Sequence, residues 1–362
     1  MKVAVLGGGN GGHAAAADLT LKAFQVSLFS LWSDDFKAVR EQGGISLVDA
    51  SGDQFVPLSP PHDSLEEALR GAVGILIVVP AQAHGDYARA CAPLLKEGQA
   101  VFLNPGSTGG ALAFRKILRE KGCADVTVSE TNTLTYICRL IGPAKVKVTS
   151  RSKVGFASFP GKKTEECFHQ FKELYPEATE RRNVLETSLT NINAILHPPG
   201  MILNAGWMEH TKGNFAYYSE GTTPAVARVI EAIDRERMAL CEKLRIGGES
   251  FLDFFYRAGS TTEEAWRSGS VYRALQDSEP NRFIRAPEGL TYRFLSEDIP
   301  FGLVPMACLG QALGIATPIM DGLIDLASLV NGTDYWKTGR TLNRMGIEGL
   351  GTESLLDFVE ES

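Results

Sequence analysis

Residues 1–19, MKVAVLGGGNGGHAAAADL, constrain the fold of this chain more than any other stretch. The apolar run KVAVL predicts a buried parallel strand, and the alanine-rich run after the glycines predicts a helix. Between them, Gly7, Gly9 and Gly12 have the spacing G-x-G-x-x-G. A strand, a glycine turn and a helix in this order are typical of a dinucleotide-binding unit.

Each glycine of this turn has a separate role in such a unit. Gly7 permits the tight bend, Gly9 lets the backbone approach a pyrophosphate, and Gly12 lets the helix pack closely on the strand. The helix N-terminus near Asn10 offers its N–H groups to the anion. We therefore predict that these four residues bind a dinucleotide cofactor, with His13 as a packing or pyrophosphate-side residue.

The end of the second expected strand, over residues 24–29, bears on the choice of cofactor. An acidic residue usually stands there to accept the ribose hydroxyls of NAD. Here Ser30 follows the strand, and Asp34 and Asp35 come only later. The two acids could bind the ribose or cap the next helix. No arginine stands there for a 2′-phosphate, so NAD and NADP both stay open with a slight lean to NAD, and we expect Ser30 to contact the cofactor.

Composition excludes several classes of protein. The net charge of −7, without a Lys/Arg cluster, gives no face for nucleic acid. No apolar run approaches the ~18 residues of a membrane helix, and the first strand is too short for a signal peptide. The six cysteines are scattered, with no C-x-x-C pair and no His/Cys metal spacing. This pattern indicates reduced thiols in a cytoplasmic protein and no metal site.

Alternating strands and helices over the first half of the chain predict a doubly wound, Rossmann-type parallel sheet. Three further apolar runs predict strands of this sheet, at residues 74–79, 100–103 and 126–129. Residues 145–159 are expected to add edge strands, and from Leu189 onward helical spacing dominates. We expect an α/β dinucleotide-binding domain over 1–188 and an all-helical domain over 189–362.

Ligands of such a sheet bind beyond the carboxyl ends of its strands. Those ends are the glycine turn and the loops that begin at Pro80, Asn104 and Glu130, which we expect to line one crevice. Pro80 is expected to contact the cofactor. Ser107, Glu130 and Thr131 are expected to contact the substrate, and loop capping is the alternative for these three.

Several short motifs resemble those of the opine dehydrogenase family, which includes octopine dehydrogenases and N-(1-carboxyethyl)amino acid dehydrogenases. The motifs are Gly-Gly-Gly-Asn-Gly-Gly at 7–12, Val-Pro-Ala-x-x-His at 79–84, Asn-Pro-Gly at 104–106, Glu-Thr-Asn-Thr at 130–133, His-Pro-Pro at 197–199, and Arg293 with Glu-Asp-Ile-Pro at 297–300. The last two are the most specific. The resemblance spans nearly the whole chain and implies an NADH- or NADPH-dependent reaction. In that reaction a 2-oxo acid, often pyruvate, is joined reductively to the amino group of an amino acid.

The resemblance also implies the catalytic residues. His197 matches the family's histidine and is the expected acid–base group, rather than a helix-terminal histidine bonded to a carbonyl. Asp298 would accept a hydrogen bond from the imidazole of His197, cap the helix that follows Asp298, or do both. Arg293 would hold the carboxylate of the oxo acid in a bidentate contact, against the alternative of a surface ion pair. Glu130 could orient the ammonium group of the amino acid.

Two rival functions are compatible with the architecture. A related two-domain reductase of a hydroxy acid or a phosphorylated substrate often uses a lysine, but Lys212, the nearest lysine after His197, falls in a loop-like segment. A nucleotide-sensing protein without turnover would have no use for a His, Asp and Arg set. The expected partners are the two substrates and a second copy in a homodimer, although the sequence determines neither the amino acid nor the oligomeric state. Weaker site candidates are His84, Arg139 and Asn204.

Overall fold

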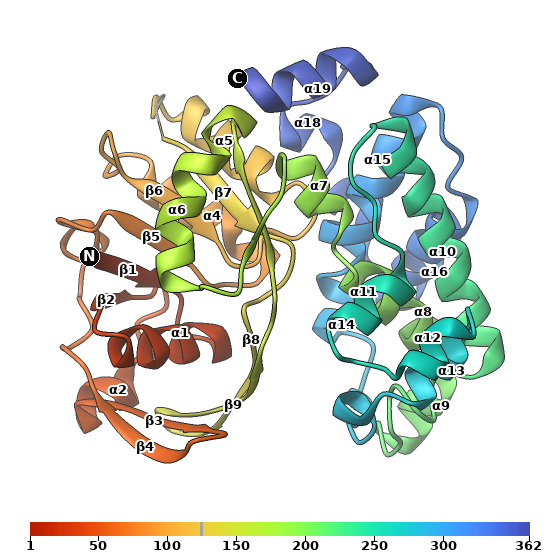
Figure 1. Cartoon of the computed structure of the whole chain (residues 1–362), viewed down its shortest axis with the longest axis horizontal. Helices are drawn as coiled ribbons and strands as arrows, with labels where there is room; N and C mark the ends of the chain where they lie inside the picture. The colour runs from red at the N-terminus through yellow and green to blue at the C-terminus, as the bar shows by residue number, and fades with distance from the viewer. Residues whose placement is uncertain (124–125) are drawn as a thin grey trace. The chain divides into compact units, whose positions relative to one another are not determined.

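The computed structural model describes residues 1–123 and 126–362, and the chain divides into two compact units. Unit 1 contains Met1–Thr187 together with Asp357–Ser362, and unit 2 contains Ser188–Leu356 (Figure 1). Within the described ranges, no helix is long and apolar enough to cross a bilayer.

Unit 1 contains a seven-stranded sheet of order β11-β10-β7-β6-β5-β1-β2. Its strands are β1 (Lys2–Leu6), β2 (Gln25–Phe29), β5 (Gly74–Ile77), β6 (Ala100–Leu103), β7 (Val128–Thr131), β10 (Gly155–Phe159) and β11 (Thr179–Glu180). The run from β2 to β7 is parallel throughout, as the doubly wound pattern predicts. The expectation of edge strands over 145–159 is wrong for β10, which lies inside the sheet and pairs antiparallel with β7.

A second sheet covers the first helix of unit 1. It has the order β4-β3-β9-β8 and is formed by β3 (Gly44–Asp49), β4 (Gly52–Pro57), β8 (Tyr136–Gly142) and β9 (Lys145–Arg151). Helix α1 (Asn10–Leu21) contacts both sheets and lies between them (Figure 1). Ala14 to Ala17 are completely buried, because the helix is enclosed on both sides, and alanine lets both sheets approach closely.

The remaining helices of unit 1 connect or flank these strands. They are α2 (Lys37–Gln42), α3 (Leu65–Leu69), η1 (Ala81–Ala83), α4 (His84–Cys91), α5 (Gly110–Glu120), η2 (Gly161–Lys163) and α6 (Thr164–Leu174), and α7 (Val184–Leu189) leads into unit 2. Ser64 is the N-cap of helix α3, and its Oγ accepts a hydrogen bond of 3.2 Å from the N–H of Glu67.

The end of the chain departs from the predicted domain division, which placed residues 189–362 together. Residues 357–362 belong to unit 1. The ring of Phe358 lies 5.3 Å from that of Phe159, and Glu360 accepts hydrogen bonds of 2.8 Å from both Arg182 and Asn183. These contacts between residues far apart in the sequence assign the last residues to the first unit.

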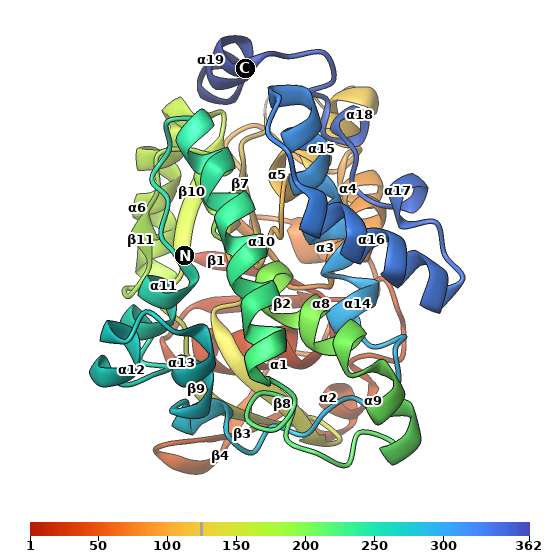
Figure 2. The same cartoon turned by 90° about the vertical axis from the view of Figure 1, so that its right-hand side faces the viewer.

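Unit 2 is helical, and its longest helix, α10 (Pro224–Lys243), contacts α8, α13, α15 and α16 (Figure 2). The other elements are α8 (Asn193–Leu203), α9 (Ala205–Thr211), α11 (Phe251–Arg257), α12 (Glu263–Arg267), α13 (Val271–Gln276), η3 (Glu279–Asn281), α14 (Arg293–Ser296), the π-helix η4 (Ile299–Leu303), α15 (Val304–Leu313), α16 (Pro318–Asn331), α17 (Tyr335–Thr338) and α18 (Leu342–Met345). The last helix, α19 (Thr352–Glu361), begins in unit 2 and ends in unit 1. Pro224 occupies the first turn of α10, where a missing N–H costs no helical hydrogen bond.

Candidate functional site

The glycine turn of unit 1 has the geometry that its spacing predicts. Gly7 has φ +117°, and a Cβ there would lie 2.5 Å from the carbonyl oxygen of Val78. A Cβ at Gly12 would lie 1.8 Å from the carbonyl oxygen of Gly7, so only glycine allows this close packing of helix on strand. Around Gly9, no atom of residues 1–123 and 126–362 lies within 4 Å of a built Cβ. The turn therefore presents open space at its middle glycine, where the pyrophosphate is predicted.

An acidic side chain lies beside this turn. The Cβ of Asp35 would be 2.2 Å from a Cβ built on Gly8, and Asp35 Oδ2 accepts a hydrogen bond of 2.6 Å from Ser30 Oγ. Helix α2 has Phe36 at its N-cap and no side-chain capping bond, so neither acid caps it. Of the two candidate acids, Asp35 is the one that the structure brings to the end of β2, next to the glycine turn. These residues therefore fit a dinucleotide with ribose hydroxyls.

The other predicted cofactor residues have different surroundings. Asn10 Oδ1 accepts a hydrogen bond of 2.9 Å from the N–H of Leu140 and so fastens the start of α1 to β8. Pro80 is exposed at the start of η1. Nδ1 of His13 donates a hydrogen bond of 3.1 Å to the carbonyl of Gly9, and the His13 ring lies 5.1 Å from that of Phe36. Burial lowers the pKa of His13, which agrees with a packing role.

Two of the predicted substrate residues are completely buried and make hydrogen bonds within unit 1. Glu130 is completely buried, and its oxygens accept hydrogen bonds of 2.7 Å from the N–H of Ala111 and from Thr187 Oγ. Its carboxylate therefore fastens the N-terminus of α5, where a negative charge is favourable, and the predicted ammonium contact finds no support in this geometry. Thr131 is also completely buried and donates a bond of 2.8 Å to the carbonyl of Thr133.

Ser107, the third predicted substrate residue, has an unusual backbone conformation. It follows β6 and has φ +58°, in the left-handed region that side chains other than glycine and asparagine rarely adopt. Such strained residues cluster at ligand sites. Among the weaker candidates, Arg139 is exposed on β8, His84 is buried at the start of α4, and Asn204 Nδ2 donates to the carbonyls of Gly200 and Gly221 at 2.8 Å each.

In unit 2, His197 lies within α8 rather than at a helix end, and the helix continues through Pro198 and Pro199. The two prolines lack the N–H groups that would bond the preceding turn. Tyr217 supports this distorted stretch by donating a hydrogen bond of 2.6 Å to the carbonyl of His197. A Cβ on Gly200 would lie 2.5 Å from the Tyr217 hydroxyl, so Gly200 makes room for it. His197 is thereby held in place, with 7% of its surface exposed.

Both nitrogens of the His197 ring have partners. Nδ1 lies 2.7 Å from Oδ2 of Asp298, and Nε2 lies 3.0 Å from the hydroxyl of Tyr218. The ring of Phe294 stacks on the imidazole, with centroids 3.7 Å apart and planes 16° apart. A carboxylate only accepts, so we assign the proton of neutral His197 to Nδ1, which leaves Nε2 to accept from Tyr218.

Asp298 occupies the N-cap position of η4, as the capping alternative predicts, but its side chain makes no capping bond. It turns to His197 instead. The N–H of Leu303 reaches back to the carbonyl of Asp298 at 3.0 Å, the long repeat of a π-helix. π-Helical turns are frequent at functional sites, because they turn a side chain out of helical register.

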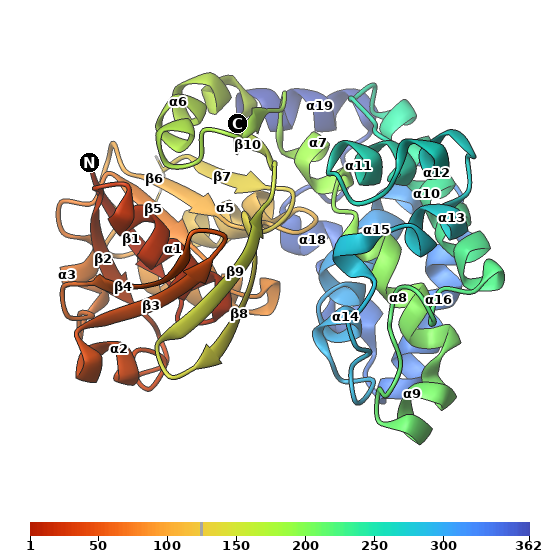
Figure 3. The same ribbon diagram turned by 60° about the horizontal axis from the view of Figure 1, so that its bottom comes forward.

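Arg293 begins α14, a short helix that contacts α8 (Figure 3). Its Nε lies 3.1 Å from Oε2 of Glu297, so the ion pair expected as the alternative is present. The Arg293 side chain is 47% exposed, whereas that of Glu297 is only 4% exposed. A buried carboxylate thus anchors a guanidinium that reaches solvent, and this arrangement is compatible with binding an anion.

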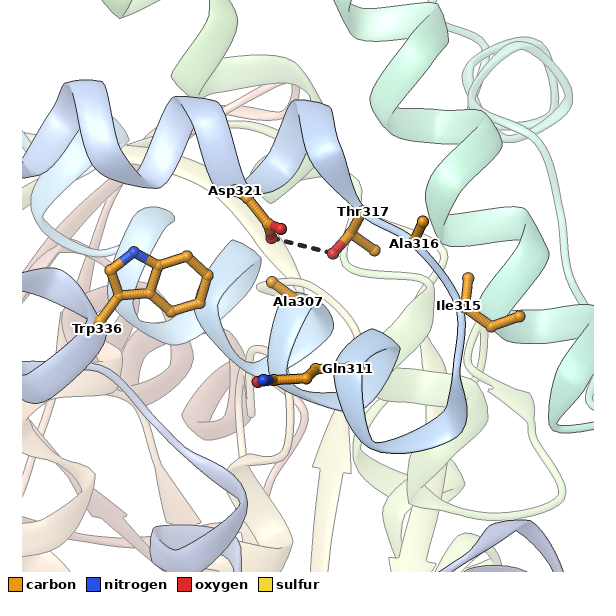
Figure 4. A pocket seen from close by; sticks show the side chains of 7 residues that line it. All are labelled: Ala307, Gln311, Ile315, Ala316, Thr317, Asp321 and Trp336. Atoms are coloured by element: carbon orange, nitrogen blue, oxygen red, sulfur yellow. Dashed lines mark hydrogen bonds between the residues drawn. The ribbon is translucent and has the colours of Figure 1, made fainter.

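Sequence reasoning missed Tyr218 and Phe294, which complete the surroundings of His197. Phe294 lies between two residues of a recognised motif, and this was the available signal. Nothing marked Tyr218. A separate pocket of about 450 Å³ lies in unit 2 between α15, α16 and Trp336 (Figure 4). Asp321 accepts a bond of 3.0 Å from Thr317 there, and none of the predicted site residues lines it.

Comparison with known proteins finds a family model, curated relatives and a solved structure that are similar to this chain. A family model described as NAD/NADP octopine/nopaline dehydrogenase, alpha-helical domain, matches residues 180–331. An opine dehydrogenase of Arthrobacter sp. (strain 1C) is 37% identical over 361 residues, which cover 99% of this chain and 98% of the relative. The protein ocs of Agrobacterium tumefaciens (strain Ach5) is 28% identical and covers 98% of both chains. A solved structure of octopine dehydrogenase with NADH and L-arginine has a TM-score of 0.80 at 22% identity and covers 98% of both chains.

Proposed function

Because this chain belongs to the opine dehydrogenase family, and is thus an NAD(P)-dependent oxidoreductase acting on CH–NH bonds, we propose that it joins pyruvate to the amino group of an amino acid. The observation that carries the assignment to named residues is the buried hydrogen bond of 2.7 Å between His197 and Asp298. A buried acid–base pair is expected of an enzyme that must move protons, and a nucleotide sensor would not need one.

His197 serves this reaction as the acid–base group. The amino acid arrives as an ammonium ion and must lose a proton before it can attack the carbonyl carbon. The resulting carbinolamine must then gain a proton on oxygen to lose water and form an iminium. His197 takes up the first proton at Nε2 and returns it in the second step, while Asp298 stabilises the imidazolium in between. The nicotinamide cofactor supplies the hydride that reduces the iminium.

Arg293 and Ser107 are the proposed substrate-binding residues. The guanidinium of Arg293 binds the carboxylate of the oxo acid, since a planar fork of N–H donors matches two carboxylate oxygens. Glu297 positions that guanidinium through an ion pair between its carboxylate and Nε of Arg293. Ser107 is proposed as a further substrate contact, on the support of its left-handed backbone at the end of β6.

For the cofactor, we propose NAD in preference to NADP. The carboxylate of Asp35 beside Gly8 can accept hydrogen bonds from ribose hydroxyls, and it would repel a 2′-phosphate. Gly9 provides the open approach for the pyrophosphate. We also place the enzyme in the cytoplasm, in keeping with six cysteines that are all unbridged. A homodimer stays a prediction.

The test is a substrate screen that crosses pyruvate and other 2-oxo acids with a set of amino acids, using NADH and NADPH in turn. We expect cofactor oxidation only when an oxo acid and an amino acid are both present, with higher kcat/KM for NADH. Oxidation with the oxo acid alone would indicate a hydroxy-acid reductase, and no oxidation with any pair would contradict the proposed function.

A further inference from the structure

We propose that Tyr218 is a proton relay, in which its phenol oxygen passes protons between Nε2 of His197 and the substrates. The inference rests on the proposed function. It concerns a residue that lies outside the motifs shared with the opine dehydrogenase family. It starts from the fact that Nδ1 faces Asp298 at 2.7 Å and Nε2 faces Tyr218 at 3.0 Å. A proton that travels between Nε2 and a substrate must therefore cross the Tyr218 oxygen, or Tyr218 must first move away.

The packing around Tyr218 favours the relay over movement. Tyr218 is 6% exposed, and its ring contacts that of Tyr217 edge to face, with centroids 5.0 Å apart. Tyr217 is itself only 1% exposed, and its hydroxyl donates a hydrogen bond of 2.6 Å to the carbonyl of His197. Swinging Tyr218 out would break its bond to Nε2 and open space in a packed aromatic group. A hydroxyl that both donates and accepts can pass a proton without moving.

The proton balance closes over the two steps. The ammonium of the amino acid gives one proton to the Tyr218 oxygen while the phenol proton passes to Nε2, which forms the imidazolium. The free amine then adds to the carbonyl carbon, and its extra proton shifts from nitrogen to oxygen. The stored proton returns from Nε2 to the Tyr218 oxygen while the phenol proton passes to the carbinolamine hydroxyl. The C–O bond breaks, water leaves, and the nitrogen lone pair forms the C=N bond of the iminium.

The test compares Tyr218→Phe with Tyr217→Phe in the full-length enzyme. Both variants lose one hydroxyl beside His197. The hydroxyl of Tyr218 is hydrogen-bonded to the imidazole ring of His197, whereas the hydroxyl of Tyr217 is hydrogen-bonded to the backbone carbonyl of His197. We expect Tyr218→Phe to lower kcat by about 100- to 10,000-fold, the range of acid–base catalysis, with little change in the KM values. The isotope effect of NADH deuterated at C4 should fall toward unity, because proton transfer becomes slower than hydride transfer.

Tyr217→Phe is expected to lower the unfolding temperature and to show a larger hydride isotope effect than Tyr218→Phe, because it weakens the support of His197 without removing the relay hydroxyl. A second variant carries 3-fluorotyrosine at position 218, which keeps the shape and the hydroxyl of tyrosine but makes the phenol more acidic. If the phenol passes protons, kcat should change when its acidity changes. The proposal is overturned if Tyr218→Phe keeps its turnover and isotope effect, or if the fluorinated enzyme has unchanged kcat. A wild type that oxidises no NADH with pyruvate and any amino acid would instead overturn the proposed function itself.

Discussion

At the scale of single residues, the pair of His197 and Asp298 makes a prediction about energetic coupling. His197→Gln should lower turnover by about 100- to 10,000-fold, since it removes acid–base catalysis, and should leave NADH affinity intact. Asp298→Asn should also be slow, because the imidazolium loses the carboxylate at 2.7 Å. If both act as one unit, the double variant should be scarcely slower than His197→Gln alone. Steady-state kinetics and NADH fluorescence titration check this. If the losses in turnover multiply in the double variant, the two residues act independently, and Asp298 has only a structural role at the N-cap of η4.

Arg293 provides the second test at this scale. A charge-assisted bidentate contact is worth roughly 2–4 kcal/mol in a partly dry site, so Arg293→Ala should lower kcat/KM for the oxo acid by about 30- to 1,000-fold. Arg293→Lys should recover only part of this, because a lysine restores charge without the planar fork.

Glu297 calls for a control in that experiment. Removing Arg293 leaves a carboxylate with only 4% exposure without this partner, which can lower stability. The unfolding temperature of each variant is therefore measured first, and Arg293→Lys, which keeps the charge, is the matched comparison. An unchanged KM and turnover for the oxo acid in folded Arg293→Ala would show that Arg293 forms only the ion pair, and Arg139 would be the next candidate.

Residue-scale prediction from sequence worked where a motif carried it. His197 and Asp298 are 101 residues apart in the sequence, and their motifs predicted the hydrogen bond that the structure shows between them. The hydrogen bond from Thr187 to the carboxylate of Glu130 could not be predicted, because the two residues are 57 positions apart and no motif links them. Tyr218 was missed for the same reason, because its contact with Nε2 arises only when distant segments pack together.

At the scale of the element, the glycine turn gives two variants with opposite expectations. Gly9→Ala should fold normally, since no atom of the part of the chain that the structure describes lies within 4 Å of the added methyl group. It should weaken NADH binding by about 10- to 100-fold, because it blocks a backbone contact to a charged phosphate. Gly12→Ala should be destabilised, since its methyl group would lie 1.8 Å from the carbonyl of Gly7. Calorimetric titration and thermal unfolding separate the two effects, and Gly9→Ala with unchanged affinity would contradict the pyrophosphate assignment.

Element types were more predictable than strand partners. Strand–glycine–helix order, the cap at Ser64 and the long helix α10 follow from local patterns. The antiparallel direction of β10 does not, because GFASF is buried throughout and an apolar run carries no information on direction. The path of α8 through Pro198 and Pro199 also escaped local rules, since tertiary contacts such as Tyr217 stabilise it.

At the scale of the whole molecule, the buried carboxylate of Asp18 links the stability of the protein to pH. It lies on α1 and bonds three groups: Lys22 at 2.9 Å, Arg151 at 2.6 Å and Tyr136 at 2.9 Å. Arg151 and Tyr136 belong to β9 and β8, so these bonds hold the enclosed helix to the small sheet. Burial raises the pKa of Asp18, but the hydrogen bonds from Lys22, Arg151 and Tyr136 outweigh it and hold the pKa below the ordinary 3.8.

Because the folded state has the lower pKa, the unfolded chain binds the proton more readily. The stabilisation by Asp18 is therefore fully present above the ordinary pKa of 3.8, which applies to the unfolded chain, and is lost as the pH falls through the lower pKa of the folded state. Asp18→Asn should lower the free energy of unfolding by about 1–3 kcal/mol at pH 7, and the difference from the wild type should shrink toward pH 3. Urea denaturation at both pH values measures it. Asp53→Asn, which removes an exposed pair with Lys145, is the matched control and should change stability by less than about 1 kcal/mol. A deficit in Asp18→Asn that is as large at pH 3 as at pH 7 would show that shape, rather than charge, makes Asp18 important to α1.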